Sequence, residues 1–279
     1  NMEMLRRFLP RYFTSDNYFS HYSLKSLTGD GVAMAEKIGA EVGKNMSIAI
    51  HALAHFPGTY TVQRLVNEPL GIIVNQNGRR FCCEDEADDA EYVTDRQPDG
   101  RGYYLLDRPT LEEGFRQVLE HIRFGDRTPT WEEFWGDLDR EAAEGKLVIA
   151  DTLEGLAPYI GCTPEALRAT VERCNSHCDA GKDDEFYKAP EHLRKIQTGP
   201  FYAIRLQRNF DVTMGGISIN EHLQALRPDQ SVIPGLYVTG DNASNWMGEE
   251  YGPMFSSFCW AMNSGYLAGE ETAAYVGQV

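Results

Sequence analysis

The chain has 279 residues, of which 42% are apolar and 11% aromatic, so it can fill a core in one large domain or two modest ones. Its 26 Lys and Arg residues against 42 Asp and Glu residues give a formal net charge of −16, which repels nucleic acids and anionic membrane surfaces. No stretch reaches the roughly 18 apolar residues of a membrane span and no signal-peptide pattern is visible, so we expect a soluble protein, in the bacterial cytoplasm or exported, without a nucleic-acid partner.

The first region of the chain ends near residue 48. Residues 27–43 predict a helix with Asp30 as its N-cap and Gly43 at its end. Its apolar face is formed by Val32, Ala35 and Ile38. The Gly29-x-Gly31 opening is similar to part of a dinucleotide fingerprint, but no buried parallel strand precedes it and the third glycine is missing. We therefore expect a capped helix and not a phosphate-binding turn.

The middle region, residues 49–195, alternates strands and helices. A hairpin is expected over 71–83, with Asn77-Gly78 as its tight turn, and a buried strand over 102–107. Thr130 and Glu133 have the spacing of a capping box at the start of one helix. The predicted helices cover 110–124, 128–145, 151–161, begun by Asp151 or Thr152, and 162–181, begun by Thr163 and Pro164. This pattern indicates an α+β unit.

The six cysteines follow no CxxC pair and no framework spacing, which favours free thiols. Cys174 and Cys178 have the i, i+4 spacing of a metal pair. However, they continue the apolar stripe that Leu167 and Val171 form on one face of the predicted helix. We therefore assign the cysteines to the core and expect no metal site.

The third region follows a predicted linker at 189–200. Strands are expected at 201–207, 212–220 and 235–240, and a closing helix at 253–276. Between the last strand and the helix lies the glycine-punctuated loop GLYVTGDNASNWMGEEYG. A strand, a glycine loop and a helix N-terminus in this order direct backbone N–H groups at the loop, which suits a bound anionic or electron-rich group.

Seven segments follow one another along the chain: TGDGVAMAEKIGA, GIIVNQNGRRFCCE, DTLEGLA, EALRATVERCNSHCDAGKDDEFYK, GPFYAI, TMGGISIN and IPGLYVTGDN. In this order they resemble the later two thirds of the FAD-dependent fumarate reductase and succinate dehydrogenase flavoproteins, in the soluble flavocytochrome-like and 3-ketosteroid dehydrogenase-like branch. The resemblance implies FAD as the cofactor of the intact protein.

The resemblance also implies the domain organisation. It assigns 1–48 to the end of a first FAD-domain segment, 49–195 to a capping (substrate) domain, and 196–279 to the returning C-terminal segment of the FAD-binding domain. The resulting fold class is α+β / α/β, a fumarate reductase-type capping domain plus the C-terminal part of the FAD-binding domain. Family members open with a glycine-rich, Rossmann-like segment that nothing before Gly29 matches, so we expect a fragment of a longer flavoprotein.

Four residues are matched to the flavin by the resemblance. Asp241, with Gly240 before it, corresponds to the acidic residue that hydrogen-bonds the flavin ribityl chain; the alternative is a turn residue that caps the next element. Gly215 and Gly216 of TMGG correspond to a close approach of the backbone to the flavin ring, where side chains are excluded.

The closing helix is expected to aim its N-terminus at the flavin N1/O2 edge. The residues at this start are Gly252, Met254 and Phe255. Just before it, ASNWMGEEYG resembles the ketosteroid dehydrogenase version of the loop, in which a tyrosine polarises the substrate carbonyl. Tyr251 is therefore the first catalytic candidate, and a packing tyrosine is its alternative.

A histidine is the second catalytic candidate. His51 lies near the family's substrate-facing histidine when counted from Gly29, with His55 as the alternative. Their spacing also matches a zinc-binding helix, but the glutamate base is missing between them, so no metal is expected. Phe56, Trp246, Phe255 and Trp260 either line an apolar substrate pocket or belong to the core.

The sequence departs from the fumarate reductase pattern where a dicarboxylate would bind. Asp88 stands near the position of the proton-delivering arginine, and Asp211-Val212 replaces a histidine. The arginine of the C-terminal loop is also missing, with Glu249-Glu250 nearby. Exchanging cationic groups for carboxylates turns attraction for a dianion into repulsion, which argues against fumarate as the substrate.

The predicted function is therefore that of an FAD-dependent oxidoreductase acting on CH–CH groups. Hydride would pass between flavin N5 and an activated C=C of an enoate or enone, ketosteroid-like compounds included, with an electron donor as a further partner. The alternative is a catalytically empty α+β module that binds no FAD by itself. A third hypothesis, an acidic interaction domain, has no apolar helix stripe to support it.

Overall fold

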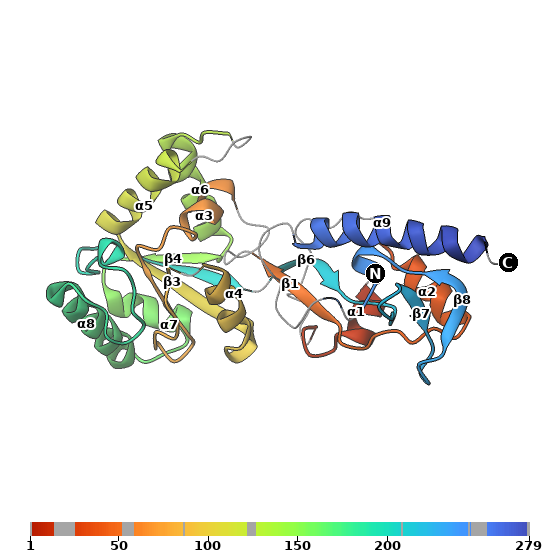
Figure 1. Ribbon diagram of the computed structural model, residues 1–279. Helices are drawn as coiled ribbons and strands as arrows, with labels where there is room; N and C mark the ends of the chain where they lie inside the picture. Colours follow the sequence, from red (N-terminus) through yellow and green to blue (C-terminus); the bar gives the residue numbers. More distant parts are fainter. Residues whose placement is uncertain are drawn as a thin grey trace. The chain divides into compact units, whose positions relative to one another are not determined.

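The computed structural model describes residues 2–13, 26–51, 59–85, 87–121, 127–207, 209–244, 246 and 256–277. The chain divides into two compact units. Unit 1 consists of Asn1–Ile50 and Phe210–Val279, and unit 2 of His51–Asn209. The chain therefore leaves unit 1 once, completes unit 2, and returns to unit 1 (Figure 1).

Unit 1 combines short strands with helices at both ends of the chain. Its elements, with β1 and β6 at the boundary to unit 2, are α1 (Met2–Phe8), α2 (Asp30–Lys37), β1 (Ser47–His51), β6 (Asn209–Met214), β7 (Gln224–Leu226), β8 (Val232–Tyr237), the 3₁₀ turn η4 (Gly240–Asn242) and α9 (Ser256–Val276).

Unit 2 is richer in helix. Its elements are α3 (Tyr60–Leu65), β2 (Ile72–Val74), α4 (Ala87–Asp95), η1 (Pro98–Gly100), β3 (Arg101–Asp107), α5 (Arg108–Glu120), α6 (Trp131–Ala143), β4 (Leu147–Ala150), η2 (Leu153–Leu156), α7 (Ala157–Ile160), α8 (Pro164–Ala180), η3 (Pro190–His192) and β5 (Phe201–Gln207).

The sheet of unit 2 is antiparallel, in the order β2-β3-β5-β4, and both of its faces are covered. Successive side chains of a strand point to opposite faces. Tyr104 and Leu106 accordingly pack with residues of α3, α5 and α6 in one core, while Tyr103 and Leu105 pack with residues of η2, α7 and α8 in another. Figure 1 shows α5 and α6 on one side of the sheet and α7 and α8 on the other.

Most of the helix caps and turns predicted in unit 2 are confirmed. Thr130 and Glu133 form the predicted capping box at α6, and Thr163 caps α8 by accepting from the Ala166 N–H. Of the two candidates before η2, Thr152 is the cap. The predicted hairpin closes through a turn with Gly78 at φ 69°, but its return strand is a single bridge between Val74 and Arg80.

All six cysteines are free thiols, as predicted. The stripe on α8 is confirmed for Leu167, Val171 and Cys174, which are buried, whereas Cys178 is half-buried. The thiol of Cys174 lies in the core of unit 2, where burial raises its pKa to about 11. A thiol with a raised pKa is unreactive near neutral pH, which agrees with a packing role.

The segment predicted as a linker is a packed part of unit 2. The Ala189 N–H donates to Asp85, and the N–H groups of Gln197 and Thr198 donate to Asp107 at 2.9 and 3.0 Å. β5 then pairs along its whole length with β3. The chain therefore leaves this unit at residue 209 and not at the predicted 195, because the sheet needs β5 between β3 and β4.

The helix α2 differs from its prediction at both ends. Its N-cap is Gly29 at φ 84°, and Asp30 is already the first helical residue. The helix stops six residues before Gly43, because Gly39 at φ 89° turns the chain in a left-handed conformation. Ile38 therefore leaves the predicted apolar face and is 55% exposed. The residues of α2 that remain buried are Val32 and Ala35.

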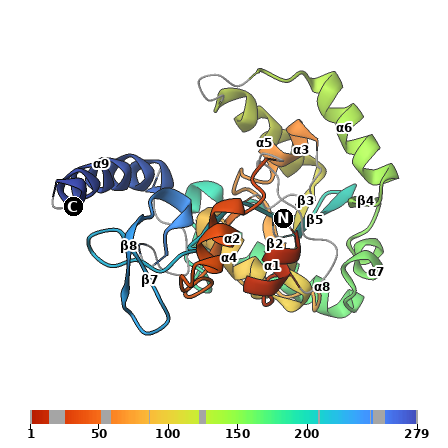
Figure 2. The ribbon, with the colours of Figure 1, turned by 90° about the vertical axis from the view of Figure 1, so that its right-hand side faces the viewer.

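Unit 1 has two small sheets, β1-β6 and β7-β8. Beyond β6 the predicted strand 212–220 continues only as isolated bridges at Ile217 and Ile219. The helix α9 lies beside β8, as Figures 1 and 2 both show, and buries only Ser264 and Ala268. Among the described helices, none has both the length and the apolar content that crossing a bilayer requires.

Candidate functional site

The loop singled out in the sequence begins with a tight turn. β8 ends at Tyr237, and Thr239 is extended before η4. Gly240 has φ 59°, a left-handed conformation that favours glycine, and Asp241 follows it on the surface. The predicted ribityl-binding residue therefore lies exposed on the turn that carries it.

Two side chains of α9 hold this turn from one side. The indole Nε1 of Trp260 donates to the carbonyl oxygen of Gly240 at 3.0 Å. The N–H of Gly240 donates to the Oγ of Ser264 at 3.1 Å. Trp260 and Ser264 are one helical turn apart, so they present their polar atoms on the same face of α9. Both backbone polar groups of Gly240 are thereby bonded to one helix.

The other end of the turn is held by the chain after TMGG. The N–H of Ile217 donates to the carbonyl oxygen of Asn242, and the N–H of Ser244 donates to that of Ile217, both at 2.8 Å. Ile217 also forms a parallel bridge with Ala243. The turn thus joins α9 to a short ladder, and Asp241 lies between the two attachments.

Gly215 and Gly216 have a structural reason to lack side chains. A Cβ at Gly216 would lie 2.6 Å from the carbonyl oxygen of Asn242, inside any real contact distance. Gly215 has φ 101°, and a Cβ there would lie 3.3 Å from the Cα of Met46. The two glycines therefore allow the turn and the β1 side of the unit to approach closely. Their approach to a flavin ring stays a prediction.

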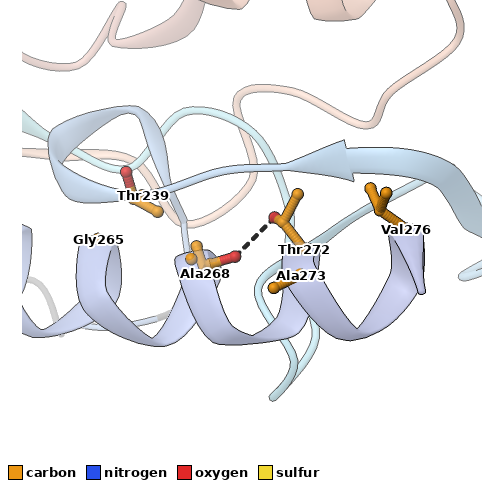
Figure 3. Close-up of a pocket in the computed structure, with 7 residues that line it drawn as sticks. Thr239, Gly265, Ala268, Thr272, Ala273 and Val276 are labelled. Carbon is orange, nitrogen blue, oxygen red and sulfur yellow. Dashed lines mark hydrogen bonds between the residues drawn. The ribbon is translucent and has the colours of Figure 1, made fainter.

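Aromatic and small side chains surround the turn. The rings of Trp246 and Trp260 stack with centroids 5.1 Å apart and planes 8° from parallel. The indole Nε1 of Trp246 is buried and has no hydrogen-bond partner among the residues that the structure describes. An open groove beginning at Thr239 follows α9 (Figure 3). On α9 it is lined by Gly265, Ala268, Gly269, Thr272, Ala273 and Val276.

Several predicted residues fall outside this description. Tyr251, Gly252, Met254 and Phe255 lie outside the described residues, as do His55 and Phe56. His51 is the last residue of β1, and its side chain is not described. Their roles toward flavin or substrate stay predictions. In the described part of unit 1, Asp241, Gly240, Gly215 and Gly216 are brought together, with the candidate aromatic residues Trp246 and Trp260 beside them.

The GRRFCCE segment of unit 2 contains a buried ion network that sequence reasoning missed. Arg80 donates to Glu84 through Nε at 2.9 Å and Nη2 at 2.7 Å, and to Asp183 through Nη1 at 2.6 Å. Lys188 lies 3.3 Å from Glu84 and donates to the carbonyl oxygen of Gly71. The i, i+4 spacing of Arg80 and Glu84 was the available signal.

The pKa of Asp183 shows the strength of the hydrogen bonds in this network. Burial alone would raise the pKa of its carboxyl, but the hydrogen bonds from Arg80 and from the N–H groups of Glu185 and Phe186 outweigh burial and lower the pKa to about 2. The carboxylate is therefore ionised at neutral pH and balances the guanidinium. Three of the five N–H groups of Arg80 donate in these contacts and its side chain is 2% exposed, so the guanidinium is not presented to a ligand at the surface.

Comparison with known proteins identifies the family. Residues 6–252 match the FAD binding domain family. The chain belongs to this family. The resemblance to FAD-dependent fumarate reductase-like and 3-ketosteroid dehydrogenase-like flavoproteins is thereby confirmed, with FAD as the family's cofactor.

Three similar proteins illustrate the relationship of this chain to the family. The vinyl phenol reductase of Lactiplantibacillus plantarum is 26% identical, over 93% of this chain and 57% of its own length. The 3-oxosteroid 1-dehydrogenase of Mycolicibacterium smegmatis is 31% identical, over 88% and 46%. The 3-ketosteroid delta1-dehydrogenase of Sterolibacterium denitrificans, solved in complex with 1,4-androstadiene-3,17-dione, gives a TM-score of 0.70 at 25% identity, over 98% and 51%. The chain spans about half the length of these relatives.

The residues of the turn fit a polyhydroxyl group such as the ribityl chain of FAD. A carboxylate accepts hydrogen bonds from hydroxyl donors, and Asp241 is exposed on a turn whose neighbouring backbone groups are bonded within the protein. The buried, unpaired N–H of Trp246 adds a donor beside the turn, counted among the described residues. An acceptor and a donor are thus both present at the turn that the sequence analysis predicted to contact the cofactor.

Proposed function

We propose that this chain is the substrate-side and C-terminal flavin-side part of an FAD-dependent oxidoreductase that acts on a CH–CH group. The relatives that support this are named as a reductase and as dehydrogenases. Residues 51–209 would be the capping domain, and 210–279 would return to the FAD-binding domain.

One observation carries the proposal. Asp241 is exposed on a turn that α9 and the ladder at Ile217 hold at its two ends. A carboxylate on a fixed turn keeps its position without ordering a loop on binding, so less conformational entropy is lost. Asp241 would accept hydrogen bonds from the ribityl hydroxyls, and this would orient the bound cofactor.

When bound, FAD supplies hydride transfer to or from one carbon of the substrate. The groups of this chain would bind and polarise the substrate. Tyr251 would donate a hydrogen bond to the substrate carbonyl oxygen, which withdraws charge from the conjugated C=C and activates it. His51 would face the substrate, and the start of the closing helix at Gly252, Met254 and Phe255 would direct its N–H groups at the negative edge of the reduced ring.

The proposed substrate is an α,β-unsaturated carbonyl compound that is larger and less anionic than fumarate. A dicarboxylate needs cationic groups that are not already paired. Arg80 is paired with Glu84 and Asp183 in the interior of unit 2. The carboxylates of Asp88, Glu249 and Glu250, which lie in the sequence near the positions of the fumarate reductase arginines, would repel a dicarboxylate substrate. An electron-donor partner completes the proposed reaction cycle.

Titration of FAD with the chain tests cofactor binding. We expect flavin fluorescence to be quenched on binding, and Asp241→Ala to raise the Kd at least about tenfold, because a hydrogen bond to a charged group is lost. Asp229→Ala is the matched control: Asp229 is another exposed aspartate of unit 1, and it accepts hydrogen bonds from the N–H and hydroxyl of the neighbouring Ser231. Unquenched fluorescence would instead support the alternative, a module that binds no FAD by itself.

Substrate choice is tested on the FAD-loaded chain. An enone should turn over and fumarate should not, and Tyr251→Phe should lower kcat on the enone by about 10²-fold or more while the flavin absorption band stays unchanged. Turnover of fumarate at a comparable rate would contradict the proposed substrate class.

A further inference from the structure

We propose that Trp260 and Ser264 of α9 are positioning residues of the FAD site, which set the place of the Asp241 carboxylate by holding the backbone of Gly240. The inference rests on the proposed function, because it assumes that Asp241 contacts FAD. Neither residue needs to touch the cofactor to act in this way.

The contacts on Gly240 leave it little freedom. Its carbonyl oxygen accepts from Trp260 at 3.0 Å and from the N–H of Ala243 at 3.1 Å, and its own N–H donates to Ser264 at 3.1 Å. A rotation of the peptide groups at Gly240 would break at least one of these bonds. The conformation that places Asp241 on the surface is therefore coupled to two side chains of α9.

The burial and hydrogen bonds of Ser264 fit it to hold Gly240. It is fully buried, one of only two buried residues of α9. Its Oγ accepts from Gly240, and its hydroxyl hydrogen can be donated to the carbonyl oxygen of Ala261, which lies at 3.5 Å. A buried hydroxyl with both an incoming and an outgoing partner is satisfied, and its removal leaves the Gly240 N–H without an acceptor.

Trp260 adds a second constraint that can be observed separately. Its ring stacks on Trp246, which follows the turn in the chain. One indole therefore bonds the start of the turn and packs against the segment after it. Two parallel indoles at 5.1 Å couple their transitions, so the pair provides a circular-dichroism signature of the packed state.

The test is a double-mutant cycle on FAD affinity, measured by flavin fluorescence. Ser264→Ala and Trp260→Phe should each raise the Kd about fivefold to tenfold, the effect of one lost hydrogen bond. In the Asp241→Ala background the same changes should have almost no effect, because both residues act through Asp241. Asn263→Ala is the control and should leave the Kd unchanged, because Asn263 is exposed on α9 and donates to the carbonyl oxygen of Cys259 within the same helix.

Two further readouts need no cofactor. Ser264→Ala should speed amide hydrogen exchange at Gly240 while the circular-dichroism contribution of the Trp246–Trp260 pair persists. Trp260→Phe should remove that contribution and leave the one from the stacked Trp131–Trp135 pair of unit 2.

The outcomes separate this inference from the proposed function. If Asp241→Ala leaves FAD affinity unchanged, or if the chain does not quench flavin fluorescence, the proposed function fails and the inference fails with it. If Asp241→Ala weakens binding but Ser264→Ala and Trp260→Phe do not, only the inference is overturned. It is also overturned if the two changes weaken binding equally with and without Asp241.

Discussion

In the interior of unit 2, the guanidinium of Arg80 donates two hydrogen bonds to the carboxylate of Glu84, through Nε at 2.9 Å and Nη2 at 2.7 Å. The pair is not isolated, because Asp183 accepts from the remaining end of the same guanidinium. A buried charge without a partner is far more costly than a buried pair. The stability of unit 2 therefore depends on keeping this network complete.

Arg80→Met should lower the free energy of unfolding of unit 2 by about 3–5 kcal/mol, because the buried carboxylates of Glu84 and Asp183 would both lose the guanidinium that pairs with them. Urea denaturation, followed by hydrogen exchange of the β3 amides, measures this. Arg168→Met is the control: Arg168 pairs with Glu154 on the surface, with side chains 47% and 38% exposed, and its loss should change stability by less than about 1 kcal/mol. Equal effects of the two changes would contradict a special role for the network.

Asp183 should make unit 2 sensitive to acid. Its pKa is lowered from 3.8 to about 2, so its contribution is present above pH 4 and is lost as the pH falls from about 4 to about 2. The contribution is about 2 kcal/mol, since one pKa unit corresponds to roughly 1.4 kcal/mol. Asp183→Asn should remove this part of the pH dependence, while costing stability at pH 7. If the free energy of unfolding of Asp183→Asn fell between pH 4 and pH 2 as steeply as that of the wild type, the assigned role of Asp183 would be contradicted.

Glu141 should change the stability of unit 2 with pH in the opposite direction to Asp183. Burial raises the pKa of its carboxyl, although Thr59 donates to it through both its N–H and its hydroxyl. A raised pKa means that the contribution of Glu141 is present below the unfolded value and is lost as the pH rises through the folded value. Glu141→Gln keeps an acceptor oxygen and cannot ionise, so it should gain stability relative to the wild type as the pH rises above 4.5, the ordinary pKa of the carboxyl. Parallel pH profiles of the two proteins would contradict this.

Gly216 should tolerate no side chain. Gly216→Ala places a Cβ against the backbone of Asn242, so it should destabilise unit 1 by about 1–3 kcal/mol and speed hydrogen exchange over 240–244. Gly269→Ala on α9 is the matched control, because a Cβ there meets nothing within 4 Å. This control should be neutral or stabilise the helix by up to about 1 kcal/mol. If both alanines behaved alike, the close approach at Gly216 would be unimportant.

The structural features that depend on residues close together in the sequence were the easiest to predict. The capping box at Thr130, the Thr163-Pro164 start of α8 and the buried strand β3 each depend on residues a few positions apart, and each is confirmed. The prediction of α2 was wrong at both ends, because Gly29 and Gly39 can each adopt a left-handed conformation, and the pattern alone did not select where the helix stops.

The candidate site was predictable only in part. The sequence pointed to Asp241 on a glycine turn, and the turn is there. It associated Gly216 with a cofactor, whereas the structure shows the backbone of Asn242 occupying the space of its missing side chain. Trp260 was a candidate pocket or core residue, and its bond to Gly240 depends on how α9 packs beside β8.

By itself, the sequence determined the family, the mixed helix and sheet class, and the starts of α6 and α8, because motif order and capping hydrogen bonds depend on residues close together in the chain. Only the tertiary structure decided that β5 completes the sheet of unit 2, that Arg80 meets Asp183 across 103 positions, and that α9 holds Gly240. Such contacts join segments distant in the chain, and they form only when burial of apolar side chains brings those segments together.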